Sequence, residues 1–328
     1  MKILDPNIET LFNIESDEDF ERKSLEVFQY QYHNNSVYQR FVDLLKVNPN
    51  SVESLASIPF LPISFFKSHT LNLKENHQAV FKSSGTTGQS RSQHFVADLS
   101  VYEKSFSFGF QRLYGDINSF AVLALLPSYL EQGDSSLVYM AKSFVEKTRS
   151  LGSDFFLHDF ERLNQSIEKL EAQGQAYIIL GVSYALLDFL EKFPQQLTCG
   201  FIMETGGMKG RRKELTKKEL HSVLSQNSGG GLIHSEYGMT ELLSQAYSKG
   251  KGIYKSPSWM KVVTRSTTDP LTLVQNQRGL LNIIDLANVN SCSFIATEDL
   301  GFVHQDGSFE VLGRFDTSEI RGCNLMVE

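Results

Sequence analysis

Residues 120–126 read FAVLALL, an uninterrupted apolar run that ends at Pro127. A run of this length is typical of a strand that is buried on both faces of a parallel sheet. Shorter apolar runs at residues 177–180 and 199–203 predict two further buried strands, and segments of helical periodicity lie between the runs. Because strands alternate with helices, the sequence predicts an α/β core.

The segments predicted to be helical share apolar side chains at intervals of three or four residues. They are residues 17–32, 100–114, 135–147, 163–171, 184–190 and 212–224. One more helix is predicted after residue 32, with Ser36 as its cap and with Val37, Phe41, Leu44 and Leu45 buried. The other predicted strands are short. They are residues 79–81, 232–233, 280–285, 293–296, 301–304 and 309–312, with a hairpin turn at Asp306-Gly307.

The order of these elements predicts three regions. Residues 1–78 form a helical N-terminal region packed on the core, residues 79–230 an α/β subdomain, and residues 231–328 a β-rich subdomain with a tail. No flexible linker separates the regions, so we expect them to pack together.

The composition and the net charge of the chain argue against several classes of protein. The chain has 328 residues, of which 41% are hydrophobic and 21% charged, as is ordinary for a globular protein. The net charge of −7 argues against a nucleic-acid partner. The longest uncharged apolar segment, residues 176–187, is too short to span a membrane, which needs about 20 residues. Three cysteines fit neither a disulfide framework nor a zinc site, which favours a cytoplasmic setting.

The loop at residues 82–91 reads KSSGTTGQSR and follows the predicted strand at 79–81. Its two glycines permit tight turns, and its hydroxyls and backbone N–H groups can surround a phosphate. The glycine spacing excludes a Walker loop. On this loop alone, a Ser/Thr/Gly surface hairpin explains the sequence equally well.

Three later segments favour the phosphate interpretation. They are Thr205-Gly206-Gly207, then Glu236-Tyr237-Gly238-Met239-Thr240-Glu241, and Thr297-Glu298-Asp299-Leu300-Gly301 leading into Gly313-Arg314-Phe315-Asp316. Their order and spacing resemble the adenylate-forming superfamily of acyl ligases over residues 80–323, and within it the LuxE-type acyl-protein synthetases, near the phenylacetate–CoA ligases. The resemblance implies an adenylate-forming α/β core with a β-rich C-terminal part. It also implies ATP-dependent, Mg²⁺-dependent activation of a carboxylic acid, most plausibly a fatty acid.

The resemblance also implies roles for single residues. It places the leaving pyrophosphate on Ser83, Ser84, Gly85, Thr86, Thr87 and Gly88, with Arg91 where the family usually has lysine. Gly206 and Gly207 would flank the adenine, where a side chain would clash. Tyr237, in the segment that also holds Gly238, would stack on the adenine ring.

Four further residues complete the implied site. Thr240 would bind the α-phosphate, and Glu241 would help to hold Mg²⁺. Asp299 would accept hydrogen bonds from both ribose hydroxyls, and Arg314 would meet the ribose or phosphate end. Such a site works by neutralising charge and aligning two anions.

The end of the chain departs from most of the superfamily. The sequence stops 14 residues after Arg314, so we expect it to lack the mobile C-terminal domain and its catalytic lysine. LuxE-type members share this feature and carry the acyl group on a cysteine near the C-terminus. Cys323 matches that cysteine by position and neighbours, with Arg321 nearby to favour the thiolate. The acyl group would then pass to a partner acyl reductase.

Several alternatives stay open at this point. The chain could transfer the acyl group directly to CoA or a carrier protein, or could be a non-catalytic nucleotide-binding module. Cys323 could be an incidental tail cysteine. We expect Cys199 and Cys292 to be core residues and His234 to be a satisfied loop histidine rather than a contact to the acyl group. The basic run at residues 209–213 is typical of a solvated helix start.

Overall fold

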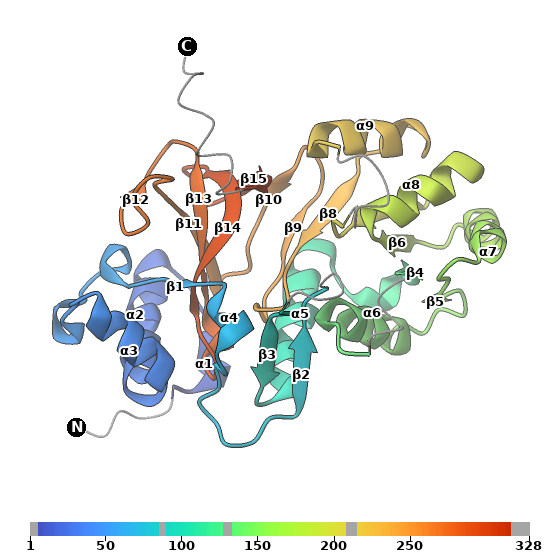
Figure 1. The fold of residues 1–328 in the computed structure, drawn as a ribbon. Helices are drawn as coiled ribbons and strands as arrows, with labels where there is room; N and C mark the ends of the chain where they lie inside the picture. The colour runs from blue at the N-terminus through green and yellow to red at the C-terminus, as the bar shows by residue number, and fades with distance from the viewer. Residues whose placement is uncertain (1–5, 85–89, 127–132, 208–214, 316–328) are drawn as a thin grey trace, which may run out of the picture.

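The structure is a computed structural model that describes residues 6–84, 90–126, 133–207 and 215–315. Two large sheets lie at opposite sides of the molecule, and a two-stranded hairpin lies between them (Figure 1). The hairpin consists of β2 (Ala79–Lys82) and β3 (Gln93–Val96). Within the described ranges, no helix combines the length and the apolar character needed to cross a bilayer.

The first sheet has six strands and forms the α/β core. In spatial order they are β5 (Asp154–Phe155), β4 (Ala121–Leu125), β6 (Tyr177–Gly181), β7 (Gly200–Glu204), β8 (His234–Tyr237) and β9 (Ala246–Ser248). All neighbouring strands pair in parallel except β8 and β9. Every residue of β4 and β6 is buried, so the prediction of central buried strands is confirmed.

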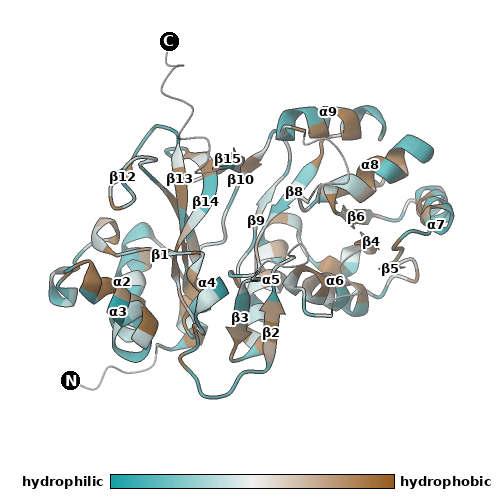
Figure 2. Ribbon diagram, viewed as in Figure 1, coloured by the Kyte–Doolittle hydropathy of each residue, from teal (hydrophilic) through white to brown (hydrophobic). Residues whose placement is uncertain are grey.

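The helices that precede or connect these strands gather around the first sheet (Figure 1). They are α5 (Leu99–Tyr114), α6 (Ser136–Lys147), α7 (Phe160–Gln173), α8 (Ser183–Lys192) and α9 (Lys217–Gln226). Helices α7 and α9 carry polar and apolar residues side by side along the ribbon, as helices covering a core do (Figure 2). A capping box begins α9, because Thr216 Oγ1 accepts a hydrogen bond from Glu219 N and Glu219 Oε2 accepts one from Thr216 N.

The second sheet is β-rich, as the sequence predicts. Its strands are β10 (Ile253–Tyr254), β15 (Phe309–Arg314), β14 (Phe294–Val303), β13 (Gly279–Asp285), β11 (Met260–Arg265) and β12 (Leu273–Val274), with β1 (Leu61–Pro62) paired in parallel with β14. The turn at Asp306-Gly307 joins β14 to β15, and Gly307 has a φ of 79°. The hairpin prediction is therefore confirmed.

Two strand predictions are wrong. The segments at 293–296 and 301–304 form one strand, β14, which continues past a register shift between Leu300 and Gly301. The strand expected at 232–233 begins at His234, because its pairing with β7 starts there, opposite Met203. Strand β11 was not anticipated. Strands β8 and β9 pair within the first sheet, although they follow residue 230, the predicted end of the α/β subdomain. The division into three regions stays a prediction.

The N-terminal region is helical. Its helices are α1 (Ile8–Leu11), α2 (Asp17–Asn34), α3 (Ser36–Leu44) and α4 (Phe65–Ser68), and the short 3-10 segments of the chain are η1 (Pro49–Ser51), η2 (Leu55–Ser57), η3 (Ile117–Ser119) and η5 (Leu286–Asn288). Ser16 caps α2 by accepting a hydrogen bond from Asp19 N at 3.1 Å. The helix predicted at 17–32 is confirmed.

The predicted cap of α3 is wrong, and its predicted buried face is confirmed only in part. Asn35, rather than Ser36, is the N-cap, since Asn35 Oδ1 accepts hydrogen bonds from Val37 N and Tyr38 N at 3.1 Å each. Of the residues predicted to be buried, Val37 and Phe41 are partly buried and pack against the core. Tyr38 and Val42 are fully buried, whereas Leu44 is 72% exposed.

The N-terminal helices pack on the second sheet through polar as well as apolar contacts (Figure 1). The buried side chain of Gln31 donates from Nε2 to Asn288 O and Val289 O, at 3.1 and 3.0 Å. Gln31 Oε1 in turn accepts from Ser293 N at 3.0 Å. These bonds fix the region that follows β13, which lies next to the candidate site.

Candidate active site

The β2–β3 hairpin presents the loop that the sequence singled out. Two hydrogen bonds close the base of this loop, from Ser83 N to Ser92 O at 3.0 Å and from Ser92 N to Ser83 Oγ at 2.9 Å. Ser84 is exposed just beyond them. Gly85, Thr86, Thr87 and Gly88 lie outside the described residues, so their phosphate role stays a prediction.

Arg91 anchors the base of the loop to Asp134, which lies just before α6. Its Nη2 lies 3.1 Å from Asp134 Oδ1 and 3.4 Å from Lys82 O, and its Nε donates to Ser83 O. Asp134 also lies 3.4 Å from Lys82 Nζ. Asp134 was missed by the sequence analysis, because nothing local marks it as the counter-ion of Arg91.

Strand β8 and the loop after it bring the Tyr237–Glu241 segment to the junction of the two sheets (Figure 1). A Cβ added at Gly238 would meet Glu236 Oε1 at 2.3 Å, so any larger residue there would have to displace the buried carboxyl of Glu236. Burial and the charge of Glu204 raise the pKa of Glu236 to about 8. Glu236 is therefore largely protonated at neutral pH, a state that no sequence signal indicated.

Tyr237, Asp299 and Arg314 meet, although they are far apart in the sequence. The Tyr237 hydroxyl donates to Asp299 Oδ2 at 2.7 Å. Asp299 on β14 is the register partner of Arg314 on β15. Burial raises the pKa of Asp299, while the Tyr237 hydrogen bond and the charge of Arg314 oppose the rise. Three residues that the sequence assigned to the nucleotide thus form one cluster.

The Tyr237 ring is held by neighbouring aromatic rings. Its centroid lies 5.8 Å from that of Tyr254 and 5.5 Å from that of Phe309, both in edge-to-face contact. Tyr237 is only 9% exposed. The position of the ring is therefore fixed by the fold before any ligand arrives.

Glu241 lies between the hairpin and the second sheet. It is 6% exposed, and burial raises its pKa against the opposing effects of the Ser92 hydroxyl, Arg314 and Lys67. Within the described ranges, no group of three or more His, Cys, Asp or Glu side chains could hold a metal ion. Mg²⁺ commonly binds through one or two carboxylates together with substrate phosphates, so a single carboxylate here fits Mg²⁺ carried by a nucleotide.

A buried polar network fixes the glycine turn after β7. Gly206 and Gly207 have φ angles of 76° and 87°, which favour glycine. Gly206 N donates to Glu204 Oε2 at 2.9 Å, and a Cβ added at Gly206 would meet no atom of the described residues within 4 Å. Among the described residues, nothing therefore fills the space beside Gly206.

Glu204 is fully buried and has two partners on α9. Its carboxylate forms an ion pair with Lys217 and accepts from His221 Nε2 at 3.2 Å. Although burial opposes ionisation, the His221 hydrogen bond and the Lys217 charge lower the pKa of Glu204 to about 2. Sequence reasoning missed this network, since Lys217 and His221 look like ordinary charged positions of an amphipathic helix.

Some of the remaining candidate residues lie in the described part of the chain, and others lie outside it. Cys292 is fully buried, as expected, whereas Cys199 is half-buried and precedes β7. His234 stacks on Phe201 with the ring centroids 4.3 Å apart, and its buried Nδ1 has no hydrogen-bond partner among the described residues, so the expectation of a satisfied histidine is not met there. Cys323 and residues 209–213 lie outside the described residues.

Solved structures with a similar fold include CoA ligases. The ATP-bound structure of MatB from Rhodopseudomonas palustris matches with a TM-score of 0.52 and 18% identity, covering 72% of this chain and 48% of MatB. 2-Hydroxyisobutyryl-CoA ligase, in the postadenylation state with R3-HIB-AMP, matches with a TM-score of 0.61 and 11% identity, covering 91% of this chain and 67% of that chain. A long-chain-fatty-acid–CoA ligase from Archaeoglobus fulgidus matches with a TM-score of 0.50 and 14% identity, covering 74% of this chain and 52% of that chain.

The fold is therefore that of the adenylate-forming enzymes, and the chain spans about half the length of MatB. More specifically, the chain belongs to the family described as acyl-protein synthetase, LuxE, whose profile matches residues 4–328. A curated relative is the long-chain-fatty-acid–luciferin-component ligase of Vibrio harveyi. It is 24% identical over 336 residues, covering 91% of this chain and 84% of the relative.

Proposed function

We propose that this chain uses ATP and Mg²⁺ to activate a fatty or related carboxylic acid and then transfers the acyl group to the thiol of Cys323. In the first step, a carboxylate oxygen attacks the α-phosphorus of ATP and pyrophosphate leaves. In the second step, the thiolate attacks the acyl carbonyl, a thioester forms and AMP leaves. The acylated protein would then deliver the acyl group to a partner acyl reductase.

The observation that supports adenylation most is the cluster of Tyr237, Asp299 and Arg314. A carboxylate held by a phenol hydroxyl and faced by an arginine can accept hydrogen bonds from ribose hydroxyls, while the arginine balances phosphate charge. Glu241 lies within electrostatic reach of the same arginine. This proposal therefore places ribose and metal-bound phosphate at adjoining positions.

The residues of this chain would act mainly by binding and orienting. The Gly206-Gly207 turn would leave room for the base, and the hairpin anchored by Arg91 would hold the pyrophosphate end. Mg²⁺, when bound, would neutralise phosphate charge. The acid's identity is proposed from family membership and from the name of the Vibrio harveyi relative, a long-chain-fatty-acid ligase.

The two cysteines that the structure describes support the choice of Cys323 as the acyl acceptor. Burial raises the pKa of the Cys292 thiol to about 12, so this thiol is both inaccessible and protonated at neutral pH. Cys199 is half-buried, with Sγ 3.7 Å from Thr198 Oγ1. Cys199 therefore serves as the natural control for Cys323.

The test has two stages. Purified protein is first incubated with ATP, Mg²⁺ and a panel of aliphatic and aromatic acids, and acid-dependent pyrophosphate release is measured. The labelled acid that gives release is then used to follow covalent protein acylation in the wild type, Cys323→Ser and Cys199→Ser. We expect Cys323→Ser to retain pyrophosphate release and to lose the label, and Cys199→Ser to retain both.

Other outcomes select the rival functions. If Cys323→Ser forms acyl-CoA or acyl-carrier product as fast as the wild type, the chain is a ligase with an external acceptor. If folded protein binds ATP and releases no pyrophosphate with any acid, catalysis by this chain alone is refuted.

A further inference from the structure

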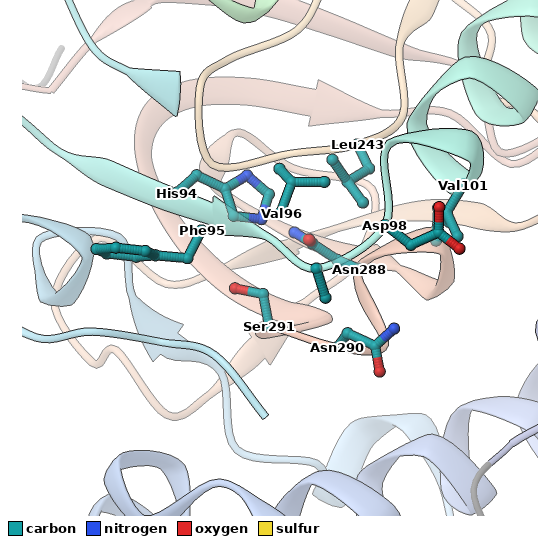
Figure 3. A pocket seen from close by; sticks show the side chains of 11 residues that line it. His94, Phe95, Val96, Asp98, Val101, Leu243, Asn288, Asn290 and Ser291 are labelled. Atoms are coloured by element: carbon teal, nitrogen blue, oxygen red, sulfur yellow. The ribbon is translucent and has the colours of Figure 1, made fainter. Parts of the chain in front are cut away.

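A small hollow is lined by residues of β3 and by residues that follow β13 (Figure 3). Two of its lining side chains, His94 and Asn288, also contact the Thr240–Glu241 turn. The volume of the hollow is about 10 Å³, which is enough for about one water molecule. The polar side chains that line it include His94 from β3, Asn288 from η5 and Asn290. His94 and Asn288 are each 1% exposed.

Each of these two buried side chains holds one carbonyl of the turn. His94 Nδ1 lies 2.8 Å from Thr240 O, and Asn288 Nδ2 donates to Glu241 O at 2.7 Å. Since a carbonyl oxygen only accepts, the hydrogen of His94 is on Nδ1. Burial lowers the pKa of His94 to about 4, so the ring is neutral at pH 7 and Nε2 is an acceptor.

The other ends of the same side chains are unsatisfied. His94 Nε2, Asn288 Oδ1 and Asn290 Oδ1 are buried atoms without a hydrogen-bond partner in the described residues. Asn288 lies close enough to the imidazole to influence the pKa of His94, yet neither His94 Nε2 nor Asn288 Oδ1 has a partner with full hydrogen-bond geometry among the described residues. Two acceptors cannot bond to each other, so a donor is required between them. A water molecule supplies two hydrogens and is the smallest group that fits.

We propose that one buried water bridges His94 Nε2 and Asn288 Oδ1, and that His94 and Asn288 are positioning residues that hold the Thr240–Glu241 turn ready for Mg·ATP. This inference rests on the proposed function only in taking Thr240 and Glu241 as the residues that meet the α-phosphate and the metal. His94 comes from the hairpin and Asn288 from η5, which follows β13 of the second sheet, so the bridge joins two elements that contact the turn.

The functional test compares two variants of His94. His94→Leu removes the donor to Thr240 O, whereas His94→Asn keeps an amide N–H near the position of Nδ1. The exposed His158→Leu is the matched control. Binding of Mg·ATP is measured by calorimetry well below each variant's melting temperature, and melting is recorded alongside.

We expect His94→Leu to weaken Mg·ATP binding about tenfold or more, because the turn loses a buried hydrogen bond. His94→Asn should restore most of the affinity, and His158→Leu should match the wild type. A lower melting temperature with unchanged affinity in His94→Leu would show a structural role only and would overturn the positioning claim. Asn288→Asp, which loses the donor to Glu241 O, provides the same comparison if His94→Leu does not fold.

The water itself is tested by a high-resolution crystal structure of the wild type. Density within hydrogen-bond distance of both His94 Nε2 and Asn288 Oδ1 is expected. A direct His94–Asn288 hydrogen bond with no intervening density would overturn the bridge. A wild type that binds Mg·ATP without releasing pyrophosphate would refute the proposed function and leave this inference standing, whereas absence of Mg·ATP binding would overturn both.

Discussion

Replacing Lys217 by methionine would test the buried ion pair that supports the Gly206 turn. Lys217 pairs with Glu204, whose side chain is fully buried. The pKa of Glu204 falls from 4.5 to about 2, with the His221 hydrogen bond and the Lys217 charge as causes. At about 1.36 kcal/mol per pKa unit, this corresponds to about 3 kcal/mol of stability at pH 7.

We therefore expect Lys217→Met to lower the free energy of unfolding by up to about 3 kcal/mol at pH 7. This is the scale, about 3–5 kcal/mol, measured when one partner of a buried pair is removed. Because the folded-state pKa of Glu204 lies below the unfolded value, its contribution is present above pH 4.5 and is lost as pH falls toward 2. The difference in the free energy of unfolding between Lys217→Met and the wild type should therefore be smaller than at pH 7, by about 1 kcal/mol at pH 4 and by about 2 kcal/mol at pH 3.

Urea denaturation at several pH values provides the measurement. Lys218→Met is the matched control, since Lys218 is the exposed neighbour on the same helix and methionine and lysine have similar helix propensity. The reasoning is refuted if Lys217→Met is no less stable than Lys218→Met at pH 7, or if their difference does not change between pH 7 and pH 4.

Three further substitutions probe the site. Tyr237→Phe removes the 2.7 Å hydrogen bond to Asp299, and we expect the Kd for ATP in calorimetry to rise at least about tenfold; an unchanged Kd would contradict the cluster. Glu241→Gln should raise the Mg²⁺ concentration for half-maximal pyrophosphate release about tenfold, and an unshifted Mg²⁺ titration would exclude Glu241 as a metal ligand. Asp285 is buried and accepts from Leu243 N and Ser244 N through Oδ2 and from Ser244 Oγ through Oδ1. Asp285→Asn should lower the free energy of unfolding, measured by urea denaturation, by about 2–4 kcal/mol. A loss below about 1 kcal/mol would show that Asp285 does not anchor Leu243 and Ser244.

Local sequence patterns predicted the α/β core well where burial was uniform. The run at residues 120–126 became β4, and the run at 177–180 became β6, because a strand buried on both faces leaves a continuous apolar signature. The patterns failed where pairing set the boundaries. β14 is continuous from Phe294 to Val303 although polar residues interrupt its apolar pattern, because backbone pairing with β13 and β15 extends the strand.

The candidate site also consists of residues that sequence motifs indicate and of partners that only the structure shows. The family resemblance carried by the glycine, tyrosine and acidic motifs proposed Tyr237, Glu241 and Asp299 as site residues without a structure. The partners of these motifs gave no such signal. His94 lies 146 residues before Thr240, and Asn288 lies 47 residues after Glu241, in segments with no recognisable motif.

The sequence by itself determined the class of fold, the three motifs and their order along the chain, because these depend on local periodicity and on residue types that the chemistry requires. Only the tertiary structure decided that Tyr237 bonds to Asp299, that Glu204 pairs with Lys217, and that the Thr240–Glu241 turn is held from both sides. Each of these contacts joins segments that separate strands or helices supply. Their meeting follows from how the sheets pair and pack over the whole chain, which no local window of sequence contains.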